Sequence, residues 1–309
     1  MAHRLFGALA DVAQPRGACS WCYEGGPLLR SQMLVRYTCP KLEAKMVRVQ
    51  RCFVLLLSTF APLSAQWLHY PTPGVPRLGD GKVNFSAPAP KSPDGKPDFS
   101  GIWEASEQQS LYPPYTTHFM DLAMDLKPEP APFQPWAKAL SEQRQANLHK
   151  DDPLAQCMPP GVPRINTIAP FKIVQTGQLI IILYETTANS AFRQIFTDGR
   201  PLPKDPQPTW LGYSIGMWEG NVLKVDTIGF NDRGWIDTAI GHPQSEALHV
   251  IERFRRPDFG HMEIAITIDD PKAYTKPWTA NLNVHLLPDT ELLEMTCENS
   301  RGVEHMVGK

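Results

Sequence analysis

The second half of the chain is a succession of short apolar runs, each ended by turn residues. The runs are rich in β-branched and aromatic residues, and pairs such as Thr176-Gly177 and Asp198-Gly199 between them are typical of tight turns. They are Phe171–Gln175, Leu179–Thr186, Phe192–Thr197, Leu211–Trp218, Val222–Thr227, Ala247–Arg255, Met262–Ile268, Thr279–Leu287 and Leu292–Cys297. Because the links are short, we expect antiparallel neighbours in a meander of about nine strands. Such a meander closes most economically into a barrel, which leaves no exposed edge.

One helix is expected before these strands, over Pro132–His149. Pro135 suits its first turn, apolar residues fall on one face, and Asp151-Asp152-Pro153 ends it. Gly101-Ile-Trp103 opens the ordered domain further upstream. The sequence therefore predicts a mainly β protein, with an antiparallel meander forming a single barrel domain over residues 101–309 and one helix before the main strands.

A segment in mid-sequence, Met46–Gln66, has the layout of a secretory signal peptide. Arg48 and Arg51 form a basic region, and Cys52–Leu63 is an apolar stretch too short to span a bilayer as a stable helix. Leu63-Ser64-Ala65 resembles an A-x-A cleavage site. We therefore expect a periplasmic or secreted protein.

Cleavage at this site would make Gln66 the mature N-terminus and residues 46–65 the signal peptide. Residues 1–45 are then explained by a translation start assigned too far upstream. The mature chain would hold 309 − 65 = 244 residues, which is enough for one large β domain with a real core.

Two cysteines remain after this cleavage. Four others precede Gln66: Cys19, Cys22, Cys39 and Cys52. Two thiols in an oxidising compartment usually pair, so we expect a disulfide between Cys157 and Cys297. A single Cys19-x-x-Cys22 pair without a second pair is weak evidence for a metal or redox site.

The segment 66–100 is dominated by Pro, Gly, Ser and Lys and holds an imperfect duplication. The two copies are Asp80–Ser86 and Asp94–Ser100. Because this composition buries little apolar surface, we interpret the segment as an extended arm laid over the barrel by Phe85 and Phe99.

The charge pattern excludes nucleic acid as a partner. The formal net charge is −2 and like charges do not cluster, so the electrostatic footprint of a nucleic-acid binder is missing. After the signal segment, the longest apolar run, Leu179–Leu183, is far too short for a membrane span. The chain gives no indication of its oligomeric state.

The motif Phe99-Ser-Gly101-Ile-Trp103 resembles the F-x-G-x-W sequence that opens the first strand of lipocalins and related calycin barrels. In those proteins the Trp plugs the closed end of the barrel. The resemblance implies a calycin-like barrel for this chain, in agreement with the expected meander.

A second resemblance extends over Pro71–Lys309. It is carried by the segments Asp94–Trp103, Cys157–Arg164, Met217–Asp226, Gly229–Asp232, Ser245–Arg253, Asp269–Pro271 and Pro277-Trp278. With them the span resembles a large family of uncharacterised secreted proteins from acidobacteria and related bacteria. That family supplies no activity for this chain.

His242, Glu246 and His249 form an H-x3-E-x2-H pattern. On a helix these residues would share one face and could hold a metal ion. The turn at Asp258–Gly260, followed by alternating apolar residues, favours a hairpin instead, which would leave His242 in a loop. Metal ligation by this set is therefore the weaker interpretation.

Polar side chains recur on one face of three successive expected strands. His249, Arg253, Glu263 and His285 would converge on a barrel cavity if that face is inward, because cross-strand neighbours lie about 5 Å apart. In that arrangement the isoleucine row from Ile264 to Ile268 would pack outward. His249, Arg253 and Glu263 are then the candidate catalytic residues.

Four further residues are candidates for ligand binding: Glu185, Arg193, His285 and Trp278. Glu185 could pair with Arg193 across the strand ladder, either as a structural ion pair or as a substrate clamp. No nucleophile motif, phosphate-binding loop or dinucleotide motif is visible, and no cofactor is expected.

We therefore expect an exported barrel that binds a small, largely apolar molecule in its mouth, with His249, Arg253 and Glu185 fixing a polar end. The alternative is a cofactor-independent or metal-assisted isomerase, lyase or hydrolase with His249 as general base. A third possibility is a structural or surface-interaction protein whose Pro-rich arm makes the contact.

Overall fold

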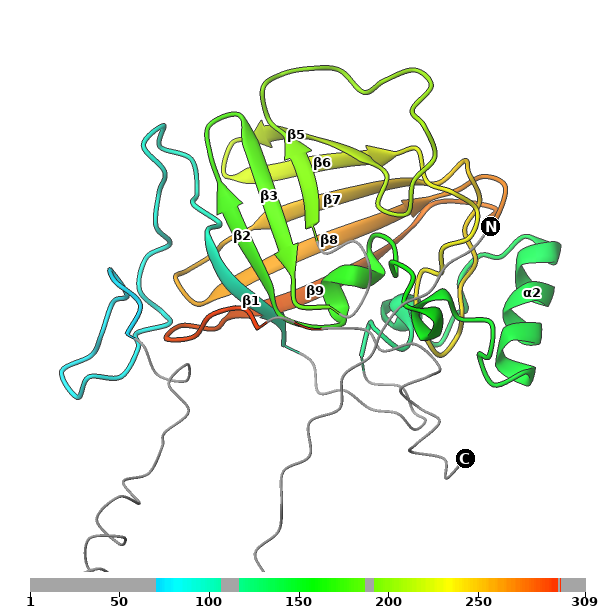
Figure 1. Cartoon of the computed structure of the whole chain (residues 1–309), viewed down its shortest axis with the longest axis horizontal. Helices are drawn as coiled ribbons and strands as arrows, with labels where there is room; N and C mark the ends of the chain where they lie inside the picture. Colours follow the sequence, from blue (N-terminus) through cyan, green and yellow to red (C-terminus); the bar gives the residue numbers. More distant parts are fainter. Residues whose placement is uncertain (1–70, 107–116, 187–191, 294, 296–309) are drawn as a thin grey trace, which may run out of the picture. The chain divides into compact units, whose positions relative to one another are not determined.

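The computed structural model describes residues 71–106, 117–186, 192–293 and 295, and these form a closed barrel of nine strands (Figure 1). The strands are β1 (Gly101–Ala105), β2 (Phe171–Gln175), β3 (Leu179–Tyr184), β4 (Phe192–Phe196), β5 (Tyr213–Glu219), β6 (Val222–Ile228), β7 (His249–Arg255), β8 (His261–Asp269) and β9 (Trp278–Leu286). Each pairs with the next, and β1 pairs with β9 to close the sheet. The prediction of a mainly β barrel is confirmed.

Two details of the strand prediction are wrong. β4 and β5 are parallel, through Ile195 and Phe196, because the long link from Thr197 to Gly212 returns the chain to the end where β4 began. The predicted strand Leu292–Cys297 is also not found in its described part. Its place is taken by β1, whose Trp103 lies opposite Leu286 of β9, so the barrel is already closed without another strand.

The interior of the barrel is filled with apolar side chains. On β8 the inward residues are Met262, Ile264, Ile266 and Ile268, and each is at most 1% exposed. The prediction that this row packs outward is therefore wrong. Burial of such a side chain stabilises the fold by about 1.5–3 kcal/mol, whereas burial of an unpaired ionisable group has a free-energy cost, so the polar row faces water.

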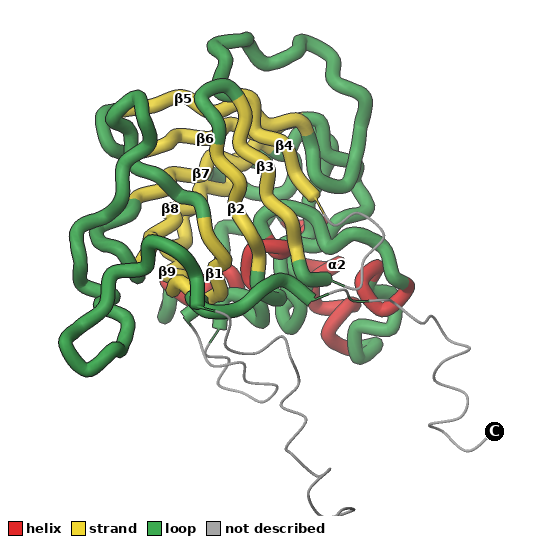
Figure 2. The backbone as a smooth tube through the Cα atoms, turned by 60° about the vertical axis from the view of Figure 1, so that its left-hand side comes forward, coloured by secondary structure: helices red, strands yellow, loops and turns green. Residues whose placement is uncertain are grey.

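Helix α2 (Pro135–Ala146) lies beside the barrel and confirms the predicted helix with shorter ends (Figure 1). Its N-terminal proline needs no hydrogen-bond partner there, and Asn147 caps its C-terminus. Leu148 and His149 follow with φ of 59° and 58°, left-handed values that are uncommon for such residues. Three short 3-10 helices lie with α2 below the strands, in the region that we call the base (Figure 2). They are η1 (Leu122–Leu126), η2 (Pro153–Gln156) and η3 (Arg164–Thr167).

The arm from residue 71 to Ser100 crosses one end of the barrel. Each copy of the duplication forms a tight turn, bridged by Arg77–Val83 and by Lys91–Pro97. The arm is held by Phe99, which is fully buried and stacks on Trp218 with ring centroids 5.6 Å apart.

The same end of the barrel is closed by Trp103, which donates its indole hydrogen to Phe99 O at 2.8 Å. The guanidinium of Arg256 lies 4.7 Å from the Trp103 ring and donates to the carbonyl of Asp98 at 2.5 Å. This arrangement ties the arm to the barrel.

Several predictions concern residues that lie outside the described ranges. They include the leader, the signal peptide, the cleavage site before Gln66, and Cys297. Cys157 is buried and disulfide-bonded, but its pairing with Cys297 stays a prediction. Within the ranges that the structure describes, no helix has the length and apolar character that a membrane span requires.

Candidate functional site

The predicted catalytic residues lie on the outer face of the barrel and do not converge. His249 Nε2 lies 2.9 Å from Asp226 Oδ1, and Arg253 lies 3.7 Å from Glu219. Glu263 accepts from the guanidinium of Arg255 at 2.7 Å. The proposed cavity of His249, Arg253, Glu263 and His285 is therefore wrong, because the inward positions of these strands are apolar.

Arg193 does face the barrel interior, but its partner is Glu252 on β7 instead of Glu185. Arg193 Nη2 donates to Glu252 Oε2 at 2.5 Å, and both side chains are at most 2% exposed. The predicted Arg193–Glu185 pair is wrong because Glu185 lies beyond the end of β3, where it accepts from the backbone of Leu293. Because successive residues of a strand point to opposite faces, Glu252 faces inward while its neighbour Arg253 faces outward.

A hydrogen-bond network surrounds this ion pair. Asn166 donates to Glu252 Oε1 at 2.9 Å and accepts from the Tyr184 hydroxyl at 2.9 Å. Arg193 also donates to Ser214 and to Thr227. Burial raises the pKa of Tyr184 well above its usual range, so the hydroxyl stays protonated and donates. The network fills the space between the strands and η3, which makes it a polar part of the core.

Trp278 is also part of the core. It is 4% exposed on β9, and its ring packs edge-on against Tyr274 at 5.5 Å between centroids. Its indole nitrogen has no hydrogen-bond partner among the residues that the structure describes. The geometry assigns it to packing at the base of the barrel.

The H-x3-E-x2-H residues are separated in the structure. Glu246 forms an ion pair with Lys272, and His249 begins β7. The side chain of Ser245 donates to Asp270 at 2.7 Å and holds the chain in a turn instead of a helix. The weak metal prediction for His242, Glu246 and His249 is therefore wrong.

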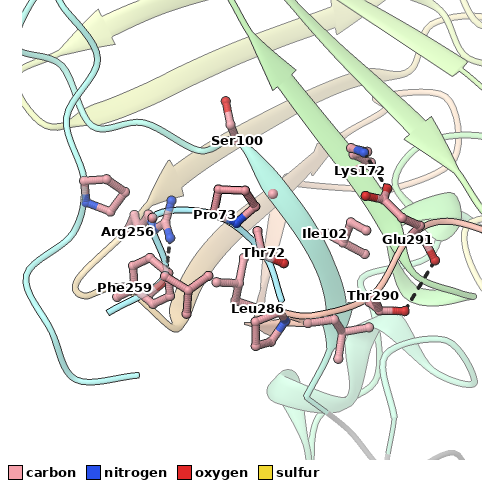
Figure 3. Close-up of a pocket in the computed structure, with 16 residues that line it drawn as sticks. Thr72, Pro73, Ser100, Ile102, Lys172, Arg256, Phe259, Leu286, Thr290 and Glu291 are labelled. Carbon is pink, nitrogen blue, oxygen red and sulfur yellow. Dashed lines mark hydrogen bonds and ion pairs between the residues drawn. The ribbon is translucent and has the colours of Figure 1, made fainter. Parts of the chain in front are cut away.

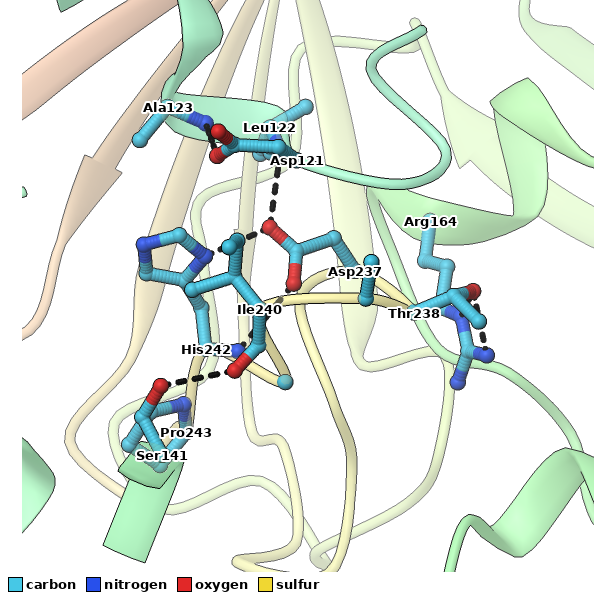
Figure 4. A network of polar contacts seen from close by, with 12 residues as sticks. Asp121, Leu122, Ala123, Ser141, Arg164, Asp237, Thr238, Ile240, His242 and Pro243 are labelled. Carbon is cyan, nitrogen blue, oxygen red and sulfur yellow. Dashed lines mark hydrogen bonds and ion pairs between the residues drawn. The ribbon is translucent and has the colours of Figure 1, made fainter. Parts of the chain in front are cut away.

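His242 instead pairs with Asp237 in the loop between β6 and β7 (Figure 4). Its Nδ1 lies 2.5 Å from Asp237 Oδ2, and the same oxygen accepts from the backbone of Leu122 at 2.7 Å. Asp121 lies nearby, and the three side chains form a buried group of metal-ligand type. Lys127 neutralises Asp121 at 3.1 Å, and backbone donors occupy both carboxylates, so the group is best explained as structural.

Side chains from several segments hold this loop. Ser141 and Arg144 of α2 donate to the carbonyls of Ile240 and Gly241 at 2.6 and 2.9 Å. Figure 4 shows Arg164 beside Thr238, to which its guanidinium donates at 2.7 Å. The loop is consequently fixed against α2 and the 3-10 helices.

A pocket of about 330 Å³ lies between α2, this loop and the segment after β4. We call it the Trp–Arg pocket. It is lined by Leu140, Gln143, Arg144, Asn147, Asp151, Pro153, Gln156, Met158, Trp210, Arg233 and Trp235. The pocket combines flat aromatic surface with two cationic side chains.

Arg144 is the distinctive group of the Trp–Arg pocket. It is 9% exposed, and its guanidinium lies 4.2 Å from the centroid of the Trp235 ring. Its one side-chain hydrogen bond is from Nη1 to the carbonyl of Gly241, and no carboxylate in the described part of the chain forms an ion pair with it. Desolvation by burial lowers the pKa of Arg144 to about 10, so the side chain is still charged at neutral pH.

Arg233 lies at the exposed rim of the same pocket. Its guanidinium lies 4.7 Å from the centroid of the Trp210 ring. The facing Asp151 accepts from Asn147 at 2.6 Å. With two arginines and one aspartate the lining carries a net positive charge, which favours an anion.

The left-handed turn after α2 supports this pocket. His149 Nε2 lies 2.7 Å from the carbonyl of Ala239, and its ring meets Trp235 edge-on. Uncommon backbone conformations such as those of Leu148 and His149 persist where the surrounding contacts over-determine them, and they concentrate at functional sites. The turn therefore places the His149 ring against the edge of Trp235 and helps to hold it in place.

A second pocket, of about 200 Å³, lies at the closed end between the arm and β1 (Figure 3). Its wall is largely apolar, with Pro73, Ile102 and Leu286. Its charged groups have polar partners: Figure 3 shows Lys172 beside Glu291, and the guanidinium of Arg256 donates to three backbone carbonyls, those of Asp98, Asp258 and Phe259. This pocket therefore has a largely apolar wall, and its charged side chains already have partners within the protein.

Sequence reasoning missed the residues that form the Trp–Arg pocket. None of Arg144, Trp210 and Trp235 was among the predicted site residues. The spacing of Arg144 from Ser141, one turn earlier on the same face, was the available signal, since both side chains reach the loop carbonyls.

No family model, curated protein or solved structure matches the chain. The resemblances to calycin barrels and to secreted acidobacterial proteins stay predictions.

Proposed function

We propose that this protein binds a small organic anion with a flat ring, in the Trp–Arg pocket. The observation that carries the proposal is Arg144, which is nine-tenths buried, forms no ion pair with a carboxylate of the described residues, and has donors to spare. Asp152 and Asp237 attract this cation without forming an ion pair with it, and desolvation still outweighs them, so a bound carboxylate or phosphate would reduce the cost of its burial.

The aromatic surface supports the second half of the proposal. Trp235 lies under Arg144, and Trp210 lies under Arg233. Trp235 is only 3% exposed, so a flat ring would stack on the partly exposed Trp210 while its anionic group meets the guanidinium of Arg144. The volume is at the lower end of the range for small-molecule pockets, so the ligand is small.

This proposal moves the ligand from the barrel mouth to the base of the molecule. The interior is occupied by the apolar rows and by the Arg193–Glu252 network, which leaves little support for a largely apolar ligand there. The enzyme alternative loses its proposed general base, since His249 lies on the outer face with its Nε2 2.9 Å from Asp226 Oδ1. Export of the protein remains a proposal supported by the signal-like segment.

The test is a titration of tryptophan fluorescence with three probes: 2-naphthoate, phenyl phosphate and neutral 2-naphthol. We expect saturable quenching with at least one anion and much weaker quenching with the naphthol. Arg144→Gln should weaken anion binding roughly ten- to a hundredfold, as expected for the loss of a hydrogen bond to a charged group. The two anions distinguish carboxylate from phosphate as the preferred group.

The matched control is Arg253→Gln, which removes an exposed arginine on the outer face of the barrel. Circular dichroism would establish that both variants are folded. The proposal fails if none of the anions saturates at millimolar concentration, or if the two variants lose the same affinity.

A further inference from the structure

We propose that the outer face of strands β2 to β5 is the interface through which two copies of this chain form a dimer. The dimer does not depend on ligand binding in the Trp–Arg pocket. Figure 2 shows β2, β3 and β4 side by side, and no helix of the described chain crosses their outer face.

Each of these four strands carries one large apolar side chain that is strongly exposed. Val174 of β2 is 40% exposed, Leu183 of β3 37%, Phe192 of β4 54% and Met217 of β5 57%. Among the described residues, the other strands carry no large apolar side chain that is exposed to the same degree. Single exposed apolar residues are ordinary, but a contiguous patch marks a surface that a partner covers.

The register of the sheet joins these residues into one surface, which we call the apolar face. Leu183 lies directly opposite Phe192, and Val174 is the diagonal neighbour of Leu183 on β2. Phe196, further along β4, lies opposite Ile215 of β5. Cross-strand neighbours at these spacings are in contact, so the patch is continuous over four strands.

The outer face of β7 to β9 is different. Arg253 of β7, Glu263 of β8 and Asn283 of β9 are exposed there and alternate with buried neighbours. The same barrel therefore has one polar and one apolar outer half. A barrel surrounded by water on all sides gains nothing from the apolar half, because its exposure has a free-energy cost.

The charges around the apolar face favour a second copy of the same chain as the partner. Three charged side chains at its edges each have an opposite charge beside them: Lys172 with Glu291, Arg200 with Asp198, and Glu219 with Arg253. An acidic or basic partner would find no unpaired charge among them. Two copies of the face can meet without burying a charge that lacks a partner.

A hollow of about 360 Å³ between β4 and β5 gives the face a place for a projecting side chain. Phe192, Phe196 and Tyr213 line it from outward positions. Met217 lies four residues beyond Tyr213 on β5, about 13 Å away. A two-fold axis in the plane of the interface, crossing β5 between these two residues, places Met217 of each copy over the hollow of the other. Methionine adapts well to such a gap.

The size of the apolar face sets the expected affinity. Its strands have between 5 and 7 residues, so the face measures about 14 by 20 Å before the relief of its side chains is counted. With its rim it reaches the lower end of stable interfaces, which bury roughly 600–1,000 Å² on each partner. We therefore expect a dissociation constant in the micromolar range.

The test is analytical ultracentrifugation of the full chain at concentrations from about 1 to about 200 μM, which bracket a micromolar dissociation constant. The average mass should rise from that of one chain to that of two. Met217→Glu and Phe192→Glu each place a charge on the apolar face and should weaken the dimer at least about thirtyfold. Both positions are more than half exposed, so the folded monomer should tolerate the changes.

The matched control is Asn283→Glu, which adds the same charge to the polar outer half and should leave dimerisation unchanged. Circular dichroism would establish that all three variants are folded. The proposal is overturned if the wild-type protein stays monomeric at the highest concentration, if Met217→Glu and Phe192→Glu dimerise as the wild type does, or if Asn283→Glu loses the same affinity. Monomeric protein that co-sediments with phosphatidylcholine vesicles would also overturn it, and would assign the face to a lipid surface.

Discussion

Arg193 and Glu252 place two opposite charges inside an apolar barrel, and their hydrogen bonds extend to Asn166 and Tyr184. A buried pair adds little net stability when both members are present, because desolvation offsets their attraction. Removal of one member leaves the other charge buried without a partner. Loss of either residue alone is therefore expected to destabilise the fold.

We predict that Glu252→Gln lowers the free energy of unfolding by about 3–5 kcal/mol. The double variant Arg193→Met/Glu252→Leu should lose clearly less than the sum of its two single variants, because it removes both charges together. Urea unfolding monitored by fluorescence measures both. Glu263→Gln, which breaks the exposed pair with Arg255, should change stability by less than about 1 kcal/mol, and an equal loss there would contradict the assignment.

At the scale of elements, the sequence predicted eight of the nine strands and the helix, because turn residues and apolar runs are local signals. It did not predict that β1 would close the sheet, since the pairing of Trp103 with Leu286 joins distant segments. The prediction of which faces of β7 and β8 point into the barrel was also wrong. Period-two alternation separates the two faces of a strand, but it does not say which one is inward.

The candidate site was less predictable than the strands for a physical reason. The Trp–Arg pocket is assembled from α2, η2 and two loops, and its key contact joins Arg144 to Gly241, 97 positions later. Such a contact leaves no periodic pattern in the sequence.

At the scale of the whole molecule, the disulfide of Cys157 bears on both the stability of the fold and the predicted processing of the chain. It is buried and disulfide-bonded directly after η2, beside the wall of the Trp–Arg pocket. We predict that its partner is Cys297. A bridge that closes a loop of about 140 residues stabilises a fold by roughly 4–5 kcal/mol in the chain-entropy model.

Peptide mapping of the exported protein without reductant checks this prediction. It should recover one crosslinked pair of peptides that contains both cysteines, and N-terminal sequencing of the same sample should begin at Gln66. Separate recovery of the two peptides with alkylated thiols would contradict the pairing. A mature chain that still holds Cys19 and Cys22 would contradict the processing.

The central claim is that the Trp–Arg pocket holds a small anion through Arg144. Native mass spectrometry of the protein, purified from its own host under mild conditions, tests it most directly. The wild-type protein should carry an added mass of one small molecule that is released as an anion on activation, and Arg144→Gln should lack it while Arg253→Gln retains it. Wild-type protein without any added mass, or Arg144→Gln that carries the same one, would contradict the claim.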